Sequence, residues 1–190
     1  MTDVFQLSYI CHMMILDAST LILLAKIEIL ETFVLNYPEK VLMPEKVREE
    51  ACLKKTEEAA LIEKLIRSNR IHVVRAKNTK LINRLMEDFH INGGEAEAVT
   101  LALQEKASMV ATDDKNAIRA CKILKIDFTT AIAILIRTFE KNLLDQDETL
   151  IKMQKLGSIA RYSRTIIEDA IKRIEGGGSY GEKDFKHSHK

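Results

Sequence analysis

The stretch "MMILDASTLILLAK" at residues 13–26 decides the fold, because it places one acid, Asp17, inside an otherwise apolar run. The residues before Asp17 have the pattern of a short buried strand, and "TLILLAKIEIL" at 20–30 has the pattern of a helix. The polar turn between them offers Asp17 or Ser19 as the natural N-cap of that helix. An acid at this place needs a structural or a chemical reason, and the rest of the chain bears on which one applies.

The rest of the chain continues this alternation of strands and helices. Strand patterns recur at 40–44, 70–76, 108–112 and 125–128. Helical patterns fill the intervals and the C-terminal part, at 45–53, 57–68, 78–88, 95–106, 115–124, 130–141 and, as two further helices, 145–175. Because strands alternate with helices, we predict an α/β fold with a parallel sheet of four to five strands and helices on both of its faces.

Composition, charge and cysteine usage limit the class of protein. With 190 residues, 46% of them hydrophobic, no Trp and two Pro, the chain suits one helix-rich globular domain. Its net charge of +1 indicates no partner by itself. The three cysteines are too widely spaced for a zinc ribbon or a disulfide framework, so we expect reduced thiols in a cytoplasmic protein. The apolar run after Asp17 stops at Lys26, short of the roughly 20 residues of a membrane span, so we expect no membrane partner.

Domain boundaries are indicated by changes in composition. We expect residues 1–12 to be an N-terminal extension, because Met13 and Met14, directly before the first predicted strand, offer an alternative start. These twelve residues lack the basic start and long apolar centre of a secretory signal. Residues 13–175 then form one domain that includes the C-terminal helices. The segment 176–190 has too little apolar content to pack, so we expect a disordered tail there.

Acids recur where sites form in a parallel sheet, beyond the carboxyl ends of its strands. The acids in such places are Asp17, Glu50 with Glu49 beside it, Glu95 at a helix start, and Asp113 and Asp114. Two like charges about 4 Å apart repel by roughly 4 kcal/mol at an effective dielectric constant near 20, so a cluster of these acids needs a counter-charge. A hard divalent cation with oxygen ligands is the simplest one, and Mg²⁺ or Mn²⁺ suits carboxylates.

Each acid taken alone also has a purely structural interpretation. A lone acid such as Asp17 is more often a helix cap than a ligand. The negative charge of Glu95 in a first helical turn interacts favourably with the helix dipole and so stabilises the helix. The pair 113–114 can form a turn and a cap, and the pair 49–50 can be surface charge. The order and context of all these acids together favour a shared site.

Four segments that carry these acids resemble, in order and spacing, the acidic motifs of PIN domains, the metal-dependent nuclease fold of many prokaryotic ribonuclease toxins. They are "ILDASTLILLAK", "MPEKVREEA", "GGEAEAVTLAL" and "VATDDKNAIRACKIL", and the resemblance spans about residues 13–140. It implies a PIN-like three-layer sandwich with a central parallel sheet, in which a cluster of acids holds one or two Mg²⁺ or Mn²⁺ ions.

The resemblance also implies roles for individual residues. The implied catalytic residues are Asp17, Glu50, Glu95 and Asp113; the implied metal ligands are Asp17, Glu95, Asp113 and Asp114; and Ser19, Glu49 and Thr130 are implied neighbours of the ligands. Glu95 departs from the many members that have Asp there, and "FTTA" at 128–131 replaces the Gly-Thr or acid of many relatives. The hydroxyl of Thr130 can equally be the N-cap of the helix that follows it.

These observations predict a Mg²⁺- or Mn²⁺-dependent endoribonuclease, a hydrolase that is either the toxin of a toxin–antitoxin pair or an RNA-processing nuclease. The expected partners are RNA, an antitoxin protein and a second copy of the chain, since small relatives often dimerise. The first alternative is a non-catalytic PIN-like scaffold that binds RNA or protein through the same surface. The second is a phosphoryl-accepting receiver-like domain, which ranks last because its acid pair would follow the first strand and not the fourth.

Positive residues are concentrated between positions 64 and 84, where no acid occurs. We predict that they hold RNA phosphates around the site; they are Lys64, Arg67, Arg70, Arg75, Lys77, Lys80 and Arg84. A solvated helix face explains the same residues, because no aromatic residues lie between them for base stacking.

Overall fold

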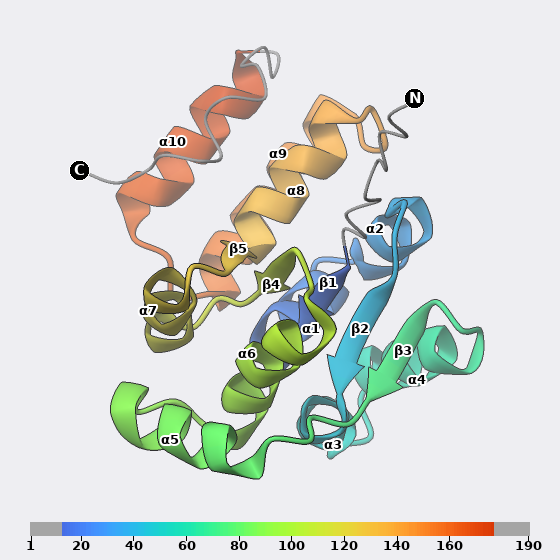
Figure 1. The fold of residues 1–190 in the computed structure, drawn as a ribbon. Coiled ribbons are helices and arrows are strands. Elements are labelled where there is room, and N and C mark those ends of the chain that lie inside the picture. Colours follow the sequence, from blue (N-terminus) through green and yellow to red (C-terminus); the bar gives the residue numbers. More distant parts are fainter. Residues whose placement is uncertain (1–12, 177–190) are drawn as a thin grey trace, which may run out of the picture.

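A computed structural model of the chain describes residues 13–176. The extension predicted at 1–12 lies outside these residues, and so does the tail predicted at 176–190 except for Gly176, which is the C-cap of the last helix. Strands and helices alternate along the described part, as the sequence predicts, and the two helices predicted at 145–175 follow the last strand (Figure 1). No helix within residues 13–176 is both long and apolar enough to cross a bilayer.

The sheet is parallel throughout, which confirms the predicted α/β architecture. Its strands are β1 (Met14–Leu16), β2 (Val41–Pro44), β3 (Ile71–Val74), β4 (Met109–Ala111) and β5 (Asp127–Thr129). They are arranged in the order β3-β2-β1-β4-β5, so the first strand of the chain lies at the centre. Every neighbouring pair is parallel, and all carboxyl ends therefore meet at one edge. We call it the carboxyl edge.

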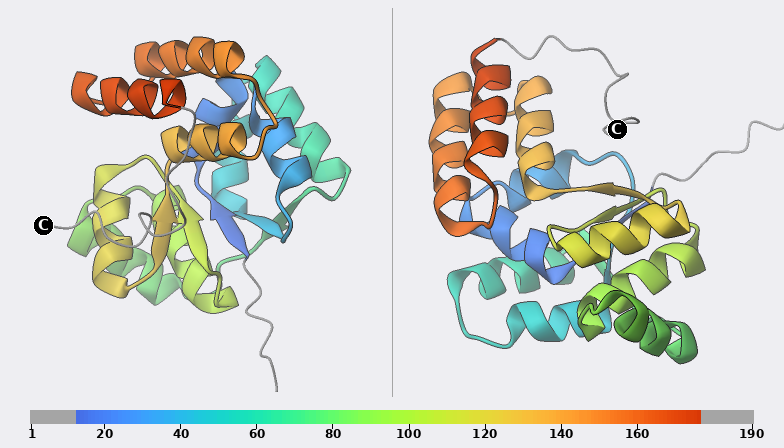
Figure 2. Two further views of the ribbon diagram at one scale, coloured as in Figure 1. Left: turned by 90° about the horizontal axis from the view of Figure 1, so that it is seen from above. Right: turned by 90° about the vertical axis from the view of Figure 1, so that its left-hand side faces the viewer.

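Helices cover both faces of this sheet and make three layers (Figures 1 and 2). The helices are α1 (Ala18–Lys26), α2 (Leu30–Asn36), α3 (Glu45–Cys52), α4 (Glu57–Arg67), α5 (Thr79–Phe89), α6 (Gly93–Glu105), α7 (Lys115–Leu124), α8 (Ala131–Glu140), α9 (Gln146–Ile159) and α10 (Arg164–Glu175). Alternate strand residues point to opposite faces. Leu16 and Met43 join a core with α1–α4 and α8–α10, whereas Ile15, Leu42 and Val110 join a second core with α5–α7.

One predicted helix is divided into two in the structure. The pattern at 20–30 predicts a continuous helix, but α1 ends at Lys26 and α2 begins at Leu30, with Glu28 between them in the left-handed region at φ 60°. In an unbroken helix, Ile27 and Ile29 would point in directions about 200° apart. The break lets both side chains be fully buried, which explains why the chain turns here.

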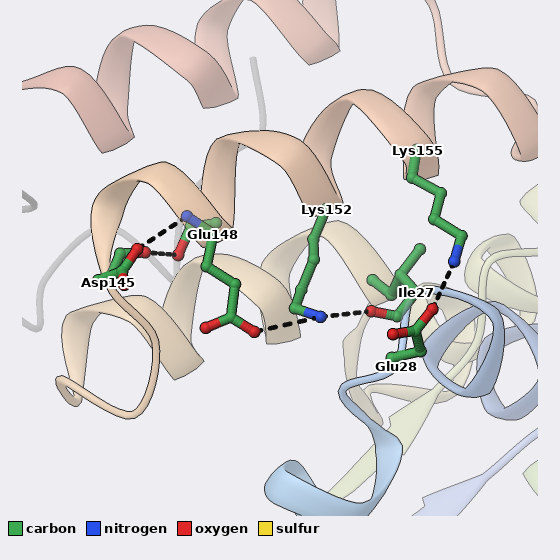
Figure 3. A network of polar contacts seen from close by, with 7 residues as sticks. Ile27, Glu28, Asp145, Glu148, Lys152 and Lys155 are labelled. Carbon is green, nitrogen blue, oxygen red and sulfur yellow. Dashed lines mark hydrogen bonds and ion pairs between the residues drawn. The ribbon is translucent and has the colours of Figure 1, made fainter.

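The break also provides the surface on which α9 packs (Figure 3). The Nζ of Lys152 donates to the carbonyl of Ile27 at 3.2 Å, one of the carbonyls that a helix end leaves without a helical partner. The same ammonium pairs with Glu148 at 3.3 Å, one turn before it on α9. Lys155 pairs with Glu28 at 2.7 Å. The C-terminal helices are therefore attached to the α1–α2 junction by specific polar contacts as well as by the core.

Candidate functional site

Asp17 lies at the centre of the carboxyl edge. The β1–β4 register pairs Leu16 with Ala111, so the next residues, Asp17 and Thr112, are neighbours. One carboxylate oxygen of Asp17 accepts hydrogen bonds from the hydroxyls of Ser19 at 2.8 Å and Thr112 at 2.7 Å. Its other oxygen accepts from the Ser19 N–H at 3.4 Å, which makes Asp17, and not Ser19, the N-cap of α1. Asp17 is only 1% exposed, and burial raises its pKa although these hydrogen bonds act in the opposite direction.

Glu50 extends from α3 over the start of α6. Its half-buried carboxylate accepts a hydrogen bond from the Gly94 N–H, and a Cβ on Gly94 would lie 2.5 Å from Oε2 of Glu50. The glycine at position 94, the second residue of α6, thus has a packing reason, since only a residue without a side chain leaves room for Glu50. Burial raises the pKa of Glu50, and the charge of Asp17 raises it further. Glu49 instead pairs with Lys46 at 2.9 Å on the surface, as the structural interpretation of that acid predicts.

Glu95 is the third residue of α6 and forms a capping box with Asn92. Its two carboxylate oxygens accept from the backbone N–H and the side-chain amide of Asn92, each at 2.9 Å, while the Asn92 side chain accepts from the Glu95 N–H. Burial raises the pKa of Glu95 to about 7, and the charges of Asp114, Asp17 and Glu50 contribute to this rise. The charges of three other acids at this edge therefore reach Glu95.

The two acids after β4 have different surroundings. Asp114 is the N-cap of α7, and its Oδ1 accepts from the N–H groups of Asn116 at 2.8 Å and Ala117 at 2.9 Å. Its Oδ2 has no hydrogen-bond partner within residues 13–176, and its charge acts on Glu95. Asp113 instead has both carboxylate oxygens engaged by protein donors.

The partners of Asp113 come from three separate elements. The hydroxyl of Thr20 on α1 donates to Oδ2 at 2.6 Å, and the Ala131 N–H at the start of α8 donates to the same oxygen at 3.0 Å. The hydroxyl of Tyr162, between α9 and α10, donates to Oδ1. The backbone N–H of Asp113 also donates to Oγ of Ser19 at 3.3 Å. The Asp113 carboxylate thus links α1, the start of α8 and the turn between α9 and α10 by hydrogen bonds. Its role as a metal ligand stays a prediction.

The donor set can be compared with what a divalent cation needs. Asp17, Glu50, Glu95 and Asp114 offer only carboxylate oxygens, the ligands that Mg²⁺ and Mn²⁺ prefer. The pKa of Glu95 is raised mainly by burial and further by the charges of neighbouring acids, which a cation would offset. Among residues 13–176, however, no three acidic, His or Cys side chains are placed to hold a metal ion as they stand. The chemistry of the donors fits a divalent cation, although Asn92 engages both carboxylate oxygens of Glu95.

Some residues at the site have no role in the sequence prediction. Thr20, Thr112, Asn92 and Tyr162 all donate to one of the acids. The Asn-x-x-Glu spacing of the capping box is a local signal that could have identified Asn92. The hydroxyl of Thr130, in contrast, accepts from the Ala133 N–H at 3.4 Å, so it is the N-cap of α8, as the alternative interpretation predicts.

The predicted phosphate-binding residues are divided by β3. Lys64, Arg67 and Arg70 precede this strand, whereas Arg75, Lys77 and Lys80 follow it and so lie toward the carboxyl edge. Lys64 pairs with Glu31 at 2.8 Å, and Arg84 with Asp88 at 3.2 Å. The stretch is therefore not one continuous surface.

The structure is a three-layer α/β sandwich with Asp17, Glu50 and Glu95 at its carboxyl edge, which is the architecture expected of a PIN domain. Residues 13–176 match the family model described as DUF3368, PIN domain, and because the match covers most of the chain, the chain belongs to the PIN domain family. PIN domains are in general nucleases and typically use divalent metals. No curated protein sequence matches the chain.

Proposed function

We propose that this protein is a Mg²⁺- or Mn²⁺-dependent endoribonuclease. The observation that carries the proposal is that Asp17 is buried, and Glu50 and Glu95 half-buried, at the carboxyl edge, close enough for the charge of Asp17 to raise the pKa of both glutamates. Burying several carboxylates together costs free energy, and a structural role requires no such grouping. Asp145, the N-cap of α9, is exposed to solvent, which shows that a cap in this chain does not require a buried carboxylate.

The residues of the chain divide the work of such a site. A bound divalent cation lowers the pKa of water and stabilises charge on a phosphodiester. Asp17, fixed by Thr112 and Ser19, and Asp114, with one oxygen unengaged within residues 13–176, would be the principal ligands. Glu50 and Glu95 would complete the ligand set or orient the attacking water as general base.

RNA is the proposed substrate, and the residues after β3 support its binding. Arg75, Lys77 and Lys80 follow the carboxyl end of β3, on the same edge as the acids. Their charges would hold phosphates flanking the cleaved bond. We place the enzyme in the cytoplasm, either as a toxin neutralised by an antitoxin protein or as an RNA-processing nuclease. The exposed Ile151, together with Ile159 and Ile166, supports a homodimer through α9 and α10.

Cleavage of short single-stranded RNA in Mn²⁺ or Mg²⁺ tests the proposal. Asp17→Asn and Asp114→Asn should each lower the rate by about 100-fold or more, because each removes a charged ligand. Asp145→Asn is the matched control, since Asp145 is also an N-cap aspartate and Asn caps a helix equally well. Activity that is unchanged in both site variants, or that persists in EDTA, would contradict the proposal.

The alternative is a non-catalytic PIN-like scaffold. It is favoured by one observation, that both carboxylate oxygens of Glu95 are engaged by Asn92. A scaffold would bind RNA or a protein without cleaving RNA, and Asp17→Asn would leave that binding unchanged. Calorimetry with Mn²⁺ separates the two, because a scaffold has no need of the cation.

A further inference from the structure

Tyr162 connects the C-terminal helices to the acidic edge. It is half-buried in the turn between α9 and α10, and its hydroxyl donates to Oδ1 of Asp113, a residue 49 positions earlier in the chain. The same hydroxyl accepts the Ile132 N–H in the first turn of α8 at 3.3 Å. The ring packs against the core beneath α8 and α9, so its position is set by that core. The tyrosine is therefore a rigid support for the carboxylate of Asp113.

Asp113 transmits this support to the neighbouring acids by two routes. Its backbone N–H donates to Oγ of Ser19 at 3.3 Å, and that hydroxyl donates in turn to Asp17 at 2.8 Å. Asp113 also directly precedes Asp114, the N-cap of α7, so holding the Asp113 side chain in place restrains the backbone that carries Asp114. The Asp17 and Asp114 carboxylates both depend on the placement of one residue, and Tyr162 is one of its donors.

We propose that Tyr162 is a positioning residue that acts through Asp113 to hold Asp17 and Asp114 in the arrangement that binds the cation. This inference rests on the proposed function. Tyr162 is not a catalytic residue, because its hydroxyl contacts Asp113, the Thr130 side chain and the Ile132 N–H, and none of the other four acids. Thr20 and the Ala131 N–H donate to the other oxygen of Asp113. Loss of the Tyr162 hydroxyl therefore removes one hydrogen bond from Asp113 and leaves these two in place.

The test compares Tyr162→Phe with Tyr37→Phe. Both substitutions remove one hydroxyl from a half-buried ring, but Tyr37 lies between α2 and β2, at the opposite edge of the sheet. Supporting partners of metal ligands typically contribute 10- to 100-fold, so we expect Tyr162→Phe to weaken Mn²⁺ binding about 10-fold by calorimetry. We expect kcat for RNA cleavage to fall by a similar factor, with KM for RNA changed less than about 2-fold. Tyr37→Phe should change neither quantity.

A double-mutant cycle with Asp113→Asn separates positioning from general stability. If Tyr162 acts through Asp113, its removal should have little further effect on Mn²⁺ affinity once Asp113 is Asn. Wild-type Mn²⁺ affinity and kcat in Tyr162→Phe, or additive effects in the cycle, would overturn the inference. The proposed function stands in that case if Asp17→Asn still abolishes cleavage. A wild-type protein that neither binds Mn²⁺ nor cleaves RNA overturns both.

Discussion

Glu95 has opposing roles at the scale of single residues. It stabilises the start of α6 through its capping box with Asn92, yet its carboxylate lies close to other acids and has a pKa of about 7. The ordinary pKa of this carboxyl group is 4.5. At a pH between 4.5 and about 7, the folded chain therefore keeps a proton on Glu95 that the unfolded chain has lost. The free energy of unfolding therefore falls as pH rises through this range, and the loss is complete above it.

Glu95→Gln should remove this pH dependence without removing the cap. Gln is an accepted partner in a capping box, and it carries no charge to repel the other acids. We expect the free energy of unfolding of the variant, relative to wild type, to rise by about 1 to 2 kcal/mol between pH 4.5 and pH 8, a figure reduced for the partial exposure of Glu95. Urea unfolding in EDTA at both pH values measures it.

Glu57→Gln is the control for this comparison, because Glu57 occupies the first turn of α4 and is exposed. Its effect should be nearly the same at both pH values. A Glu95→Gln effect that is equally independent of pH would show that the pKa of Glu95 is not raised in the folded protein.

The sequence predicts the acids better than it predicts their contacts. Asp17 and Asp114 could be identified because a strand precedes each of them and a helix follows. The difference between Asp113 and Asp114 could not, because the two are adjacent and either could cap the helix, whereas the partners that engage the Asp113 carboxylate are distant in sequence. Tyr162 has no local signal at all, since its contact with Asp113 exists only after α9 and α10 have packed.

At the scale of elements, the start of α6 is shaped by its contact with α3. Gly94 is buried, and Glu50 occupies the space where a side chain would stand. Gly93 faces more open surroundings, where a Cβ would lie 3.8 Å from the nearest atom of Lys46. Gly94 is therefore needed to accommodate the Glu50 carboxylate, whereas position 93 has room for a larger residue.

Gly94→Ala should therefore impair the site more than the fold. The new methyl group displaces the end of the flexible Glu50 side chain, which costs little stability but removes its hydrogen bond with the residue 94 N–H. We expect RNA cleavage and Mn²⁺ affinity to fall about 10-fold, while the melting temperature changes by no more than a few degrees. Gly93→Ala should leave both activities near wild type. Equal effects of the two substitutions would show that Glu50 has no part in the site.

The division between α1 and α2 shows where element prediction reaches its limit. Apolar residues continue through 20–30 with helical spacing, and no Pro or Gly marks a stop. The turn at Glu28 is stabilised because it buries both Ile27 and Ile29 and lets the Ile27 carbonyl accept a hydrogen bond from Lys152. Both reasons involve the packed molecule, so a local pattern cannot contain them.

At the scale of the whole molecule, Lys152 and Lys155 offer a test of how α9 is attached. The side chain of Lys152 is 12% exposed and bonds a backbone carbonyl, whereas the Lys155 side chain is 45% exposed and pairs with a glutamate in solvent. Lys152→Met should cost about 1 to 3 kcal/mol of unfolding free energy, because the Ile27 carbonyl loses its partner. Lys155→Met should cost less, and its effect should shrink in 1 M salt.

Urea unfolding of the two variants measures the difference, with the slope of each transition checked against wild type. Equal costs at low salt would show that the buried contact of Lys152 contributes no more than a surface ion pair.

The strand order has a consequence for how the protein is made. Asp17 leaves the ribosome early, but the hydroxyl of Thr112 that holds it is synthesised 95 residues later, and β1 lacks one of its two neighbours until then. At about 5 to 20 residues per second, this leaves several seconds in which the nascent chain carries the acid but not its pocket. Under the proposed function, a chain that is still being synthesised therefore does not cleave the mRNA that encodes it.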